Sequence, residues 1–83
     1  MKTFRLLVVE DSDVDAGLVE TALSEIRIPT IQATRAFSLQ EARQRLAHKP
    51  FDAVLLDLDL PDSIGAATLH RILPTTACLV IAT

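Results

Sequence analysis

The chain has 83 residues, of which 49% are hydrophobic, and its formal net charge is −3, which indicates one folded domain and excludes a disordered tail. Asp and Glu outnumber Lys and Arg, so the sequence offers no basic surface for nucleic acid and no polybasic patch for a membrane. Because the single Cys78 can form no internal disulfide and no apolar run is long enough to span a bilayer, we expect a cytoplasmic protein.

The first part of the chain predicts a strand, a helix and a second strand. Phe4–Val9 is apolar apart from Arg5 and ends in acidic residues, which fits a strand buried on both faces of a parallel sheet. Ser12 or Asp13 can cap the helix that follows, and Pro29 ends it. The apolar stripe of this helix recurs every four residues at Val14, Leu18, Ala22 and Ile26, widened by Val19 and Leu23.

Residues 30–34, after the helix, are a short strand candidate.

A second helix begins with a capping box, formed by Ser38 and Glu41. Phe37 before the box and Ala42 after it are spaced as a hydrophobic staple. Leu39, Ala42 and Leu46 are expected to face inward, and Pro50 closes this segment.

The last part of the chain predicts two more strands around a third helix. Ala53–Leu56 is an unbroken apolar run that ends at Asp57, and residues 58–63 are expected to form a loop. Gly65 opens a short helix that runs to about Leu73, and residues 77–82 form the fourth strand. Strands that alternate with helices in this way indicate an α/β fold with right-handed crossovers.

Two strand orders are compatible with this alternation. In the flavodoxin-like order 2-1-3-4, a parallel sheet lies in a three-layer sandwich and its first and third strands are neighbours. Glu10 and Asp11, at the end of the first strand, then lie beside Asp57 at the end of the third. Carboxylates packed this closely either raise a pKa or recruit a cation, and oxygen ligands of this kind suit Mg²⁺.

A single acidic residue after a strand is more often a helix cap or a solvated loop residue, as we expect for Asp13. Acidic residues at two adjacent strand ends reverse that balance in favour of a site. An Asp beside a divalent cation can attack a phosphoryl group and carry it as an acyl phosphate.

Two segments carry a resemblance to a known family. Residues 6–12 (LLVVEDS) and 53–65 (AVLLDLDLPDSIG) resemble the receiver domains of two-component response regulators. The resemblance implies that residues 1–83 are the N-terminal two-thirds of a receiver, up to its fourth strand. It also implies that Asp57 accepts a phosphoryl group from a sensor histidine kinase or a phosphotransfer protein, in a regulatory domain that catalyses only its own phosphorylation.

The resemblance assigns roles to five residues. Asp11 would bind Mg²⁺ directly, and Glu10 would act through a metal-bound water. Asp57 would be both acceptor and ligand, and the backbone carbonyl of Asp59 would be a further ligand. Thr83 matches the hydroxyl residue that moves to hydrogen-bond the phosphoryl group.

The chain also departs from the family, because complete receivers add a fourth helix, a fifth strand that ends in Lys, and a fifth helix. Without them, the fourth strand is expected to be an unpaired apolar edge, and part of one sheet face is expected to lack its cover. We therefore expect a fragment of a longer protein, or a chain completed by a second copy or by another chain.

Two alternatives remain at this stage. The first is a truncated or degenerate receiver that serves only as an interaction module, since the family's Lys is missing. The second is a haloacid-dehalogenase-type phosphatase, because Asp57 and Asp59 resemble that family's nucleophile and acid/base pair, and residues 79–83 resemble its second motif. Against it, the acidic strand comes first in those enzymes, and Glu10 and Asp11 would have no role.

The remaining polar residues are expected to be structural. His48 and His70 are expected to be exposed, and Arg35, Arg43 and Arg45 to be solvated charges. Asp62 and Ser63 are expected to shape their loop and cap the third helix.

Overall fold

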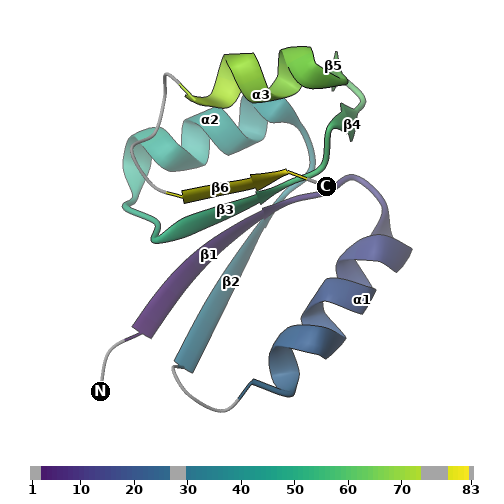
Figure 1. The fold of residues 1–83 in the computed structure, drawn as a ribbon. Helices are drawn as coiled ribbons and strands as arrows, with labels where there is room; N and C mark the ends of the chain where they lie inside the picture. The colour runs from purple at the N-terminus through teal and green to yellow at the C-terminus, as the bar shows by residue number, and fades with distance from the viewer. Residues whose placement is uncertain (1–2, 27–29, 74–78, 83) are drawn as a thin grey trace.

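The computed structural model describes residues 3–26, 30–73 and 79–82. Its main sheet has four strands, in the order β2-β1-β3-β6 (Figure 1). All neighbouring pairs in this sheet are parallel. Because β6 is the fourth strand of the main sheet in the sequence, the predicted flavodoxin-like order 2-1-3-4 is confirmed. The strands are β1 (Thr3–Val9), β2 (Thr30–Ala36), β3 (Ala53–Leu56) and β6 (Leu79–Ala82).

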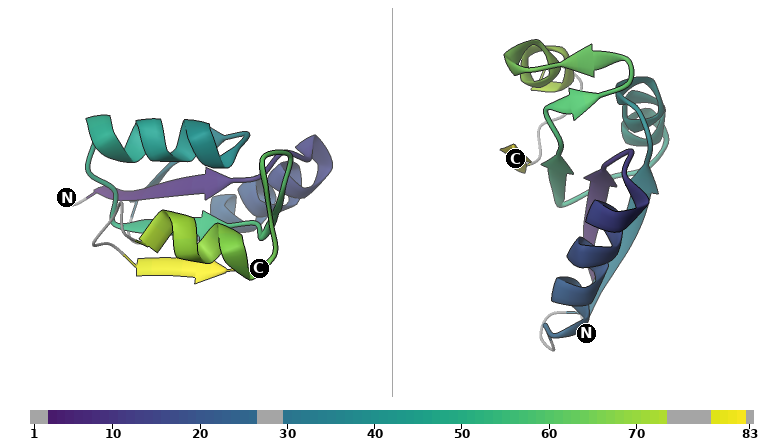
Figure 2. Two further views of the ribbon diagram at one scale, coloured as in Figure 1. Left: turned by 90° about the horizontal axis from the view of Figure 1, so that it is seen from above. Right: turned by 90° about the vertical axis from the view of Figure 1, so that its right-hand side faces the viewer.

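Helices on both faces of the sheet make the predicted three layers (Figure 2). The helix α1 (Asp13–Ser24) covers one face, and α2 (Leu39–His48) and α3 (Ala66–Ile72) cover the other. Alternate residues of a strand point to opposite faces, so each face of the sheet has a core of its own. The larger core lies on the α2 and α3 side. Its fully or nearly fully buried members are Leu7, Val9, Ala36, Leu39, Ala42, Val54, Leu56, Leu60 and Ile72.

The face of α1 that packs on the sheet agrees with the predicted one only in part. Ala16 is 2% exposed, and Val19 and Leu23 pack against the smaller core of Leu6, Val8 and Ala53. The small Ala16 side chain lets the helix approach the sheet. Val19 follows Ala16 by three residues and Leu23 follows Val19 by four, so the three side chains share one face of the helix. Val19 and Leu23, which widen the predicted stripe, are thus confirmed as core contacts, whereas its other large members are exposed: Val14 is 74% exposed, Leu18 65% and Ile26 47%.

The predicted helix starts are confirmed by their caps. The Ser12 hydroxyl accepts a hydrogen bond from Asp15 N–H at 3.3 Å, and the Ser38 hydroxyl accepts one from Glu41 N–H at 3.1 Å. The Glu41 carboxylate accepts from Phe37 N–H at 2.6 Å, one residue before the position that a capping box uses. These bonds satisfy amide groups that have no partner within the helix.

The expectation of a loop over residues 58–63 is wrong. The strands β4 (Asp59–Leu60) and β5 (Ser63–Ile64) form a small antiparallel hairpin. Pro61 favours the turn between them, and Gly65 has a φ of 69°, which lets the chain turn directly into α3. A buried hydrogen bond of 2.8 Å from the Thr68 hydroxyl to the Ser63 hydroxyl ties the hairpin to α3.

Asp62 caps a helix, but it is α2 and not the predicted α3. Its carboxylate accepts hydrogen bonds from Leu39 N–H at 2.8 Å and Gln40 N–H at 2.9 Å. Burial would raise the pKa of Asp62, but these backbone hydrogen bonds and the charge of Arg71 outweigh it and lower the pKa below 3.8. The hairpin therefore holds the start of α2 across more than twenty residues of sequence.

Replacing Asp62 with Ala should lower the free energy of unfolding by about 1 kcal/mol at neutral pH, because two helix amides lose their acceptor. The lowered pKa means that this contribution is present above pH 3.8 and is lost as the pH falls through the lower folded value. Urea unfolding of both proteins between pH 7 and pH 2 would show it. Equal stability of the two proteins at neutral pH would contradict the assignment.

Candidate functional site

The carboxyl ends of β1 and β3 bring the acidic residues together. Beyond the strands, Glu10 N–H donates to Ala36 C=O at 2.9 Å and Asp57 N–H donates to Val9 C=O at 3.0 Å. These two bonds extend the parallel hydrogen bonding by one residue past the strand ends. The backbone of Glu10 and of Asp57 is therefore fixed by the sheet and not by the loops that follow.

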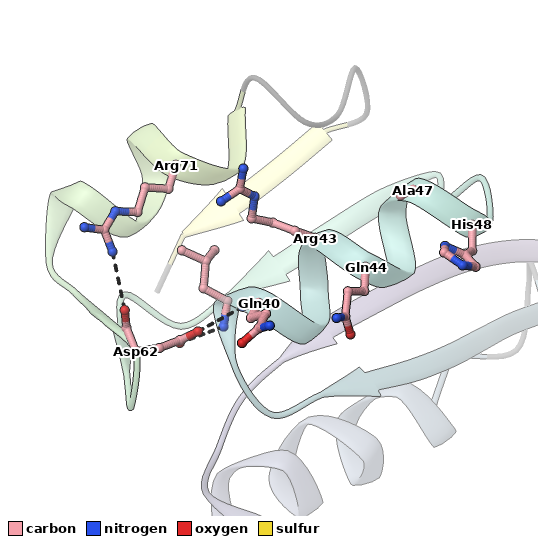
Figure 3. A pocket seen from close by; sticks show the side chains of 8 residues that line it. Gln40, Arg43, Gln44, Ala47, His48, Asp62 and Arg71 are labelled. Carbon is pink, nitrogen blue, oxygen red and sulfur yellow. Dashed lines mark hydrogen bonds between the residues drawn. The ribbon is translucent and has the colours of Figure 1, made fainter.

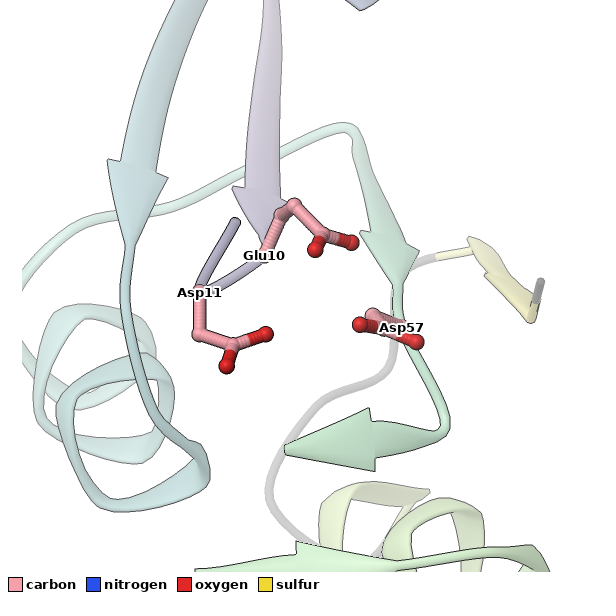
Figure 4. A group of neighbouring side chains, drawn as sticks. All are labelled: Glu10, Asp11 and Asp57. Carbon is pink, nitrogen blue, oxygen red and sulfur yellow. The ribbon is translucent and has the colours of Figure 1, made fainter. Parts of the chain in front are cut away.

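Three carboxylates converge at this edge of the sheet. Glu10, Asp11 and Asp57 each offer an oxygen, and these oxygens lie within 4.8 Å of one another (Figure 4). Glu10 is 9% exposed, Asp57 is half-buried and Asp11 is exposed. The spacing predicted from the strand order is thus present in the described structure.

The carboxylates of this cluster repel one another. Burial raises the pKa of Glu10 above 4.5, and the carboxylates of Asp57 and Asp15 raise it further, against the hydrogen bond that Ser12 N–H donates to Glu10 at 3.1 Å. Asp57 Oδ1 accepts a hydrogen bond from Asp59 N–H at 3.0 Å. These two backbone amides orient two of the carboxylates toward their shared space.

Arg35 is a site residue that the sequence reasoning missed, since it was expected to be a solvated charge. Its side chain is only 21% exposed. The guanidinium donates from Nε to Glu10 C=O at 3.0 Å and from Nη1 to the Asp13 carboxylate at 2.7 Å, and it lies 4.0 Å from the centre of the Phe37 ring. Arg35 therefore connects the end of β2 to both ends of the acidic segment 10–13, at Glu10 and at Asp13.

The other predicted site residues are placed as follows. Asp59 follows Asp57 at the start of β4, and its side chain is exposed and lies outside the three-carboxylate group. Thr83 lies outside the described residues. His48 and His70 are exposed, as expected.

A hollow of about 330 Å³ opens beside the carboxylates, between α1 and the sheet. Glu10, Asp15 and Asp57 line one end of it, and apolar side chains that include Leu18 and Leu55 line the rest. The site thus has an approach from solvent on the α1 face of the sheet.

Comparison with known proteins identifies this arrangement, although no family model matches the chain. The response regulator MaeR, bound to beryllium trifluoride, superposes with a TM-score of 0.83 at 25% identity, over 96% of this chain and 66% of its own. A CheY-like receiver domain from Methylobacillus flagellatus gives 0.78 at 28% identity, over 98% of this chain and 69% of its own. The response regulator protein PilR of Pseudomonas aeruginosa is 35% identical over 65 residues, or 78% of this chain. The chain belongs to the receiver domains of response regulators.

This receiver spans 14% of the length of PilR and about two thirds of the two solved chains. PilR and MaeR are both response regulators, which supports a regulatory rather than a catalytic role for this domain. Among the described residues, no helix combines the length and apolar character needed to cross a bilayer.

Proposed function

We propose that this receiver accepts a phosphoryl group on Asp57 from a histidine kinase or a phosphotransfer protein, in the cytoplasm and with Mg²⁺ bound. The observation that supports the proposal is the convergence of Glu10, Asp11 and Asp57 within 4.8 Å at the ends of two adjacent strands. A strand-end crevice of this kind is where open α/β sheets bind their ligands.

The donor set fits Mg²⁺. Carboxylate oxygens are hard ligands, and a divalent ion would offset the repulsion that raises the pKa of Glu10. Asp11 and Asp57 would hold the ion directly, with the backbone carbonyl of Asp59, and Glu10 would act through a water. When bound, the ion would neutralise charge on the carboxylates and on phosphoryl oxygens.

The chain's own residues supply the acceptor and its orientation. A carboxylate oxygen of Asp57 would attack the phosphorus of a phosphohistidine, so that a P–O bond forms while the P–N bond breaks and its electron pair returns to the imidazole. The Asp59 N–H, bonded to Asp57 Oδ1, limits rotation of the carboxylate. Thr83 would then supply the hydroxyl that hydrogen-bonds the phosphoryl group, and its movement would alter a partner surface.

Mg²⁺-dependent binding of beryllofluoride tests this function, because that group mimics a phosphoryl on a carboxylate. Titration followed by ¹⁹F NMR should show a bound signal with the wild type and none with Asp57→Asn. Asp59→Asn is the matched control, since it removes one charge nearby but keeps the backbone carbonyl and N–H.

The same pair of variants separates the two rivals. A haloacid-dehalogenase-type phosphatase would turn over a generic phosphate ester and lose that turnover with Asp59→Asn, whereas a receiver would show none. A receiver that serves only as an interaction module would bind no beryllofluoride even as wild type. Turnover of the ester would overturn the signalling function, and a wild type that binds no beryllofluoride would overturn phosphoryl acceptance.

We also propose a second copy of the chain as a partner, because large apolar side chains are exposed on the α1 face of the sheet. Leu79 is 63% exposed and Ile81 46%, and the sheet register places them beside Ala53 and Leu55 on the face that α1 only partly covers. Leu18, 65% exposed, lines the hollow on this face together with Leu55. Burying such a surface is favourable, and exposed patches of this kind mark contact sites.

We expect the chain to elute from size exclusion as a concentration-dependent oligomer at micromolar levels. Ile81→Lys should shift it toward the monomer, because a charge would have to be buried in the contact. The exposed Ile64 of the hairpin is the matched control, and Ile64→Lys should leave the elution unchanged. A compact wild-type monomer at every concentration would contradict this prediction.

A further inference from the structure

A second hollow lies on the opposite face of the sheet, between α2 and α3. It has a volume of about 580 Å³ (Figure 3). No residue that lines it takes part in the carboxylate site or in the α1 face, so it is independent of the proposed function. Its lining residues are Leu39, Gln40, Arg43, Gln44, Ala47, His48, Asp62 and Arg71.

The hollow carries net positive charge, because its two guanidinium groups outnumber its single carboxylate, that of Asp62. Arg43 is exposed and makes no ion pair with another described residue. Within the described part of the chain, Arg71 donates two long hydrogen bonds, both of 3.4 Å, to Asp62 C=O and to the Ser63 hydroxyl. The one carboxylate in the lining, that of Asp62, is already engaged by two α2 amides.

The neighbouring polar groups add hydrogen-bonding capacity. Gln40 and Gln44 follow the same side of α2 at a spacing of four residues and line the hollow with Arg43. Figure 3 shows Arg43 reaching from α2 toward α3, and Arg71 extending from α3 above Asp62. Two guanidinium groups thus border one concave surface from two different helices.

We propose that the α2–α3 groove binds an acidic segment of a partner protein. Guanidinium groups pair with carboxylates through two parallel hydrogen bonds, and the glutamine amides can bond the backbone of an extended peptide. A nucleic acid fits less well, because phosphate binding needs many cations and the chain as a whole carries −3. The occupant is therefore a short run of Glu or Asp.

The test is fluorescence anisotropy of a labelled peptide of alternating Glu and Ala, titrated with the full chain at low salt. A peptide with Gln in place of Glu should bind at least tenfold more weakly. Arg43→Gln and Arg71→Gln should each weaken binding about tenfold, with Arg43→Lys in between because it keeps charge but loses the planar fork. Far-UV circular dichroism and melting would confirm that the Arg71 variant is folded.

Arg45→Gln is the matched control, since it removes the same charge from α2 but Arg45 pairs with Glu41 outside this groove. It should change the affinity by less than a factor of about two. Equal losses with Arg45→Gln, or no binding of the Glu peptide, would overturn the proposal. Tighter binding of a single-stranded DNA oligomer than of the peptide would overturn it as well.

Discussion

Replacing Asp57 with Asn is expected to raise the melting temperature of the metal-free protein and to abolish the further rise that Mg²⁺ gives the wild type. Three carboxylates with oxygens within 4.8 Å repel one another, and the substitution removes one of the three charges. A relief of about 1 kcal/mol corresponds to about 4 to 8 °C in a domain of this size. In the wild type, Mg²⁺ at ten times its dissociation constant should add about 1.4 kcal/mol.

Differential scanning calorimetry in EDTA and in a series of Mg²⁺ concentrations measures both effects. Asp59→Asn should behave like the wild type in both conditions, because its exposed side chain lies outside the cluster. If Asp57→Asn melts lower than the wild type without metal, the carboxylates do not repel as proposed. If Mg²⁺ still stabilises this variant as it does the wild type, the ion binds elsewhere.

Asp57→Asn should also change how the free energy of unfolding depends on pH. Because the pKa of Glu10 is raised in the folded chain, its contribution to stability is fully present below pH 4.5 and is lost as the pH rises through the higher folded value. Asp57 is one cause of that raised pKa, so Asp57→Asn should weaken this loss. Asp62, with its lowered pKa, acts in the opposite direction and at lower pH.

The strand order and the carboxylate cluster could be predicted because both follow from strong local patterns. Two buried apolar runs end in acidic residues, and parallel strands put their carboxyl ends at one edge of the sheet. The choice of order was also supported by the family resemblance. The oxygens of Glu10, Asp11 and Asp57 then had to meet once β1 and β3 were neighbours.

Features that depend on long-range contact could not be predicted in this way. The β4–β5 hairpin has only two residues in each strand, too few to show a periodic pattern. Asp62 follows α2 by many residues, so its role as the cap of α2 rather than α3 depends on how the hairpin folds back. The buried face of α1 is set by the small Ala16, whereas the larger Val14 and Leu18 dominated the sequence pattern.

Arg35 illustrates the same limit at the site itself. A charged residue near a strand end is usually solvated, and apart from the Phe37 ring nothing local to Arg35 indicates its partners. Its hydrogen-bond partners, Glu10 C=O and the Asp13 carboxylate, lie in the segment after β1. The sheet register brings β2 to that segment, because Arg35 pairs with Val8 of β1. The alternation of the strand then points Arg35 to the α1 face, beside Asp13.

Replacing Arg35 with Ala should therefore lower the free energy of unfolding by about 2 kcal/mol and weaken Mg²⁺ binding about fivefold. The variant loses the bonds to Glu10 C=O and to Asp13 and the stacking on Phe37, so the acidic segment is less ordered. Loss of a positive charge alone would act the other way and strengthen the binding of a cation. Ordering is expected to dominate, because Asp13 already balances the Arg35 charge.

The double variant Arg35→Ala with Asp13→Ala separates these two effects, since it leaves the net charge near the cluster unchanged. Isothermal titration with Mg²⁺, well below the melting temperature of each variant, should show the same weakening in the double variant as in Arg35→Ala, or a larger one. Arg45→Ala, which breaks an exposed pair within α2, should leave the affinity unchanged. A double variant that binds Mg²⁺ as tightly as the wild type would mean that the sheet alone fixes Glu10 and Asp11. The bonds from Glu10 N–H to β2 and from Asp57 N–H to β1 would then be sufficient to hold the three carboxylates in place.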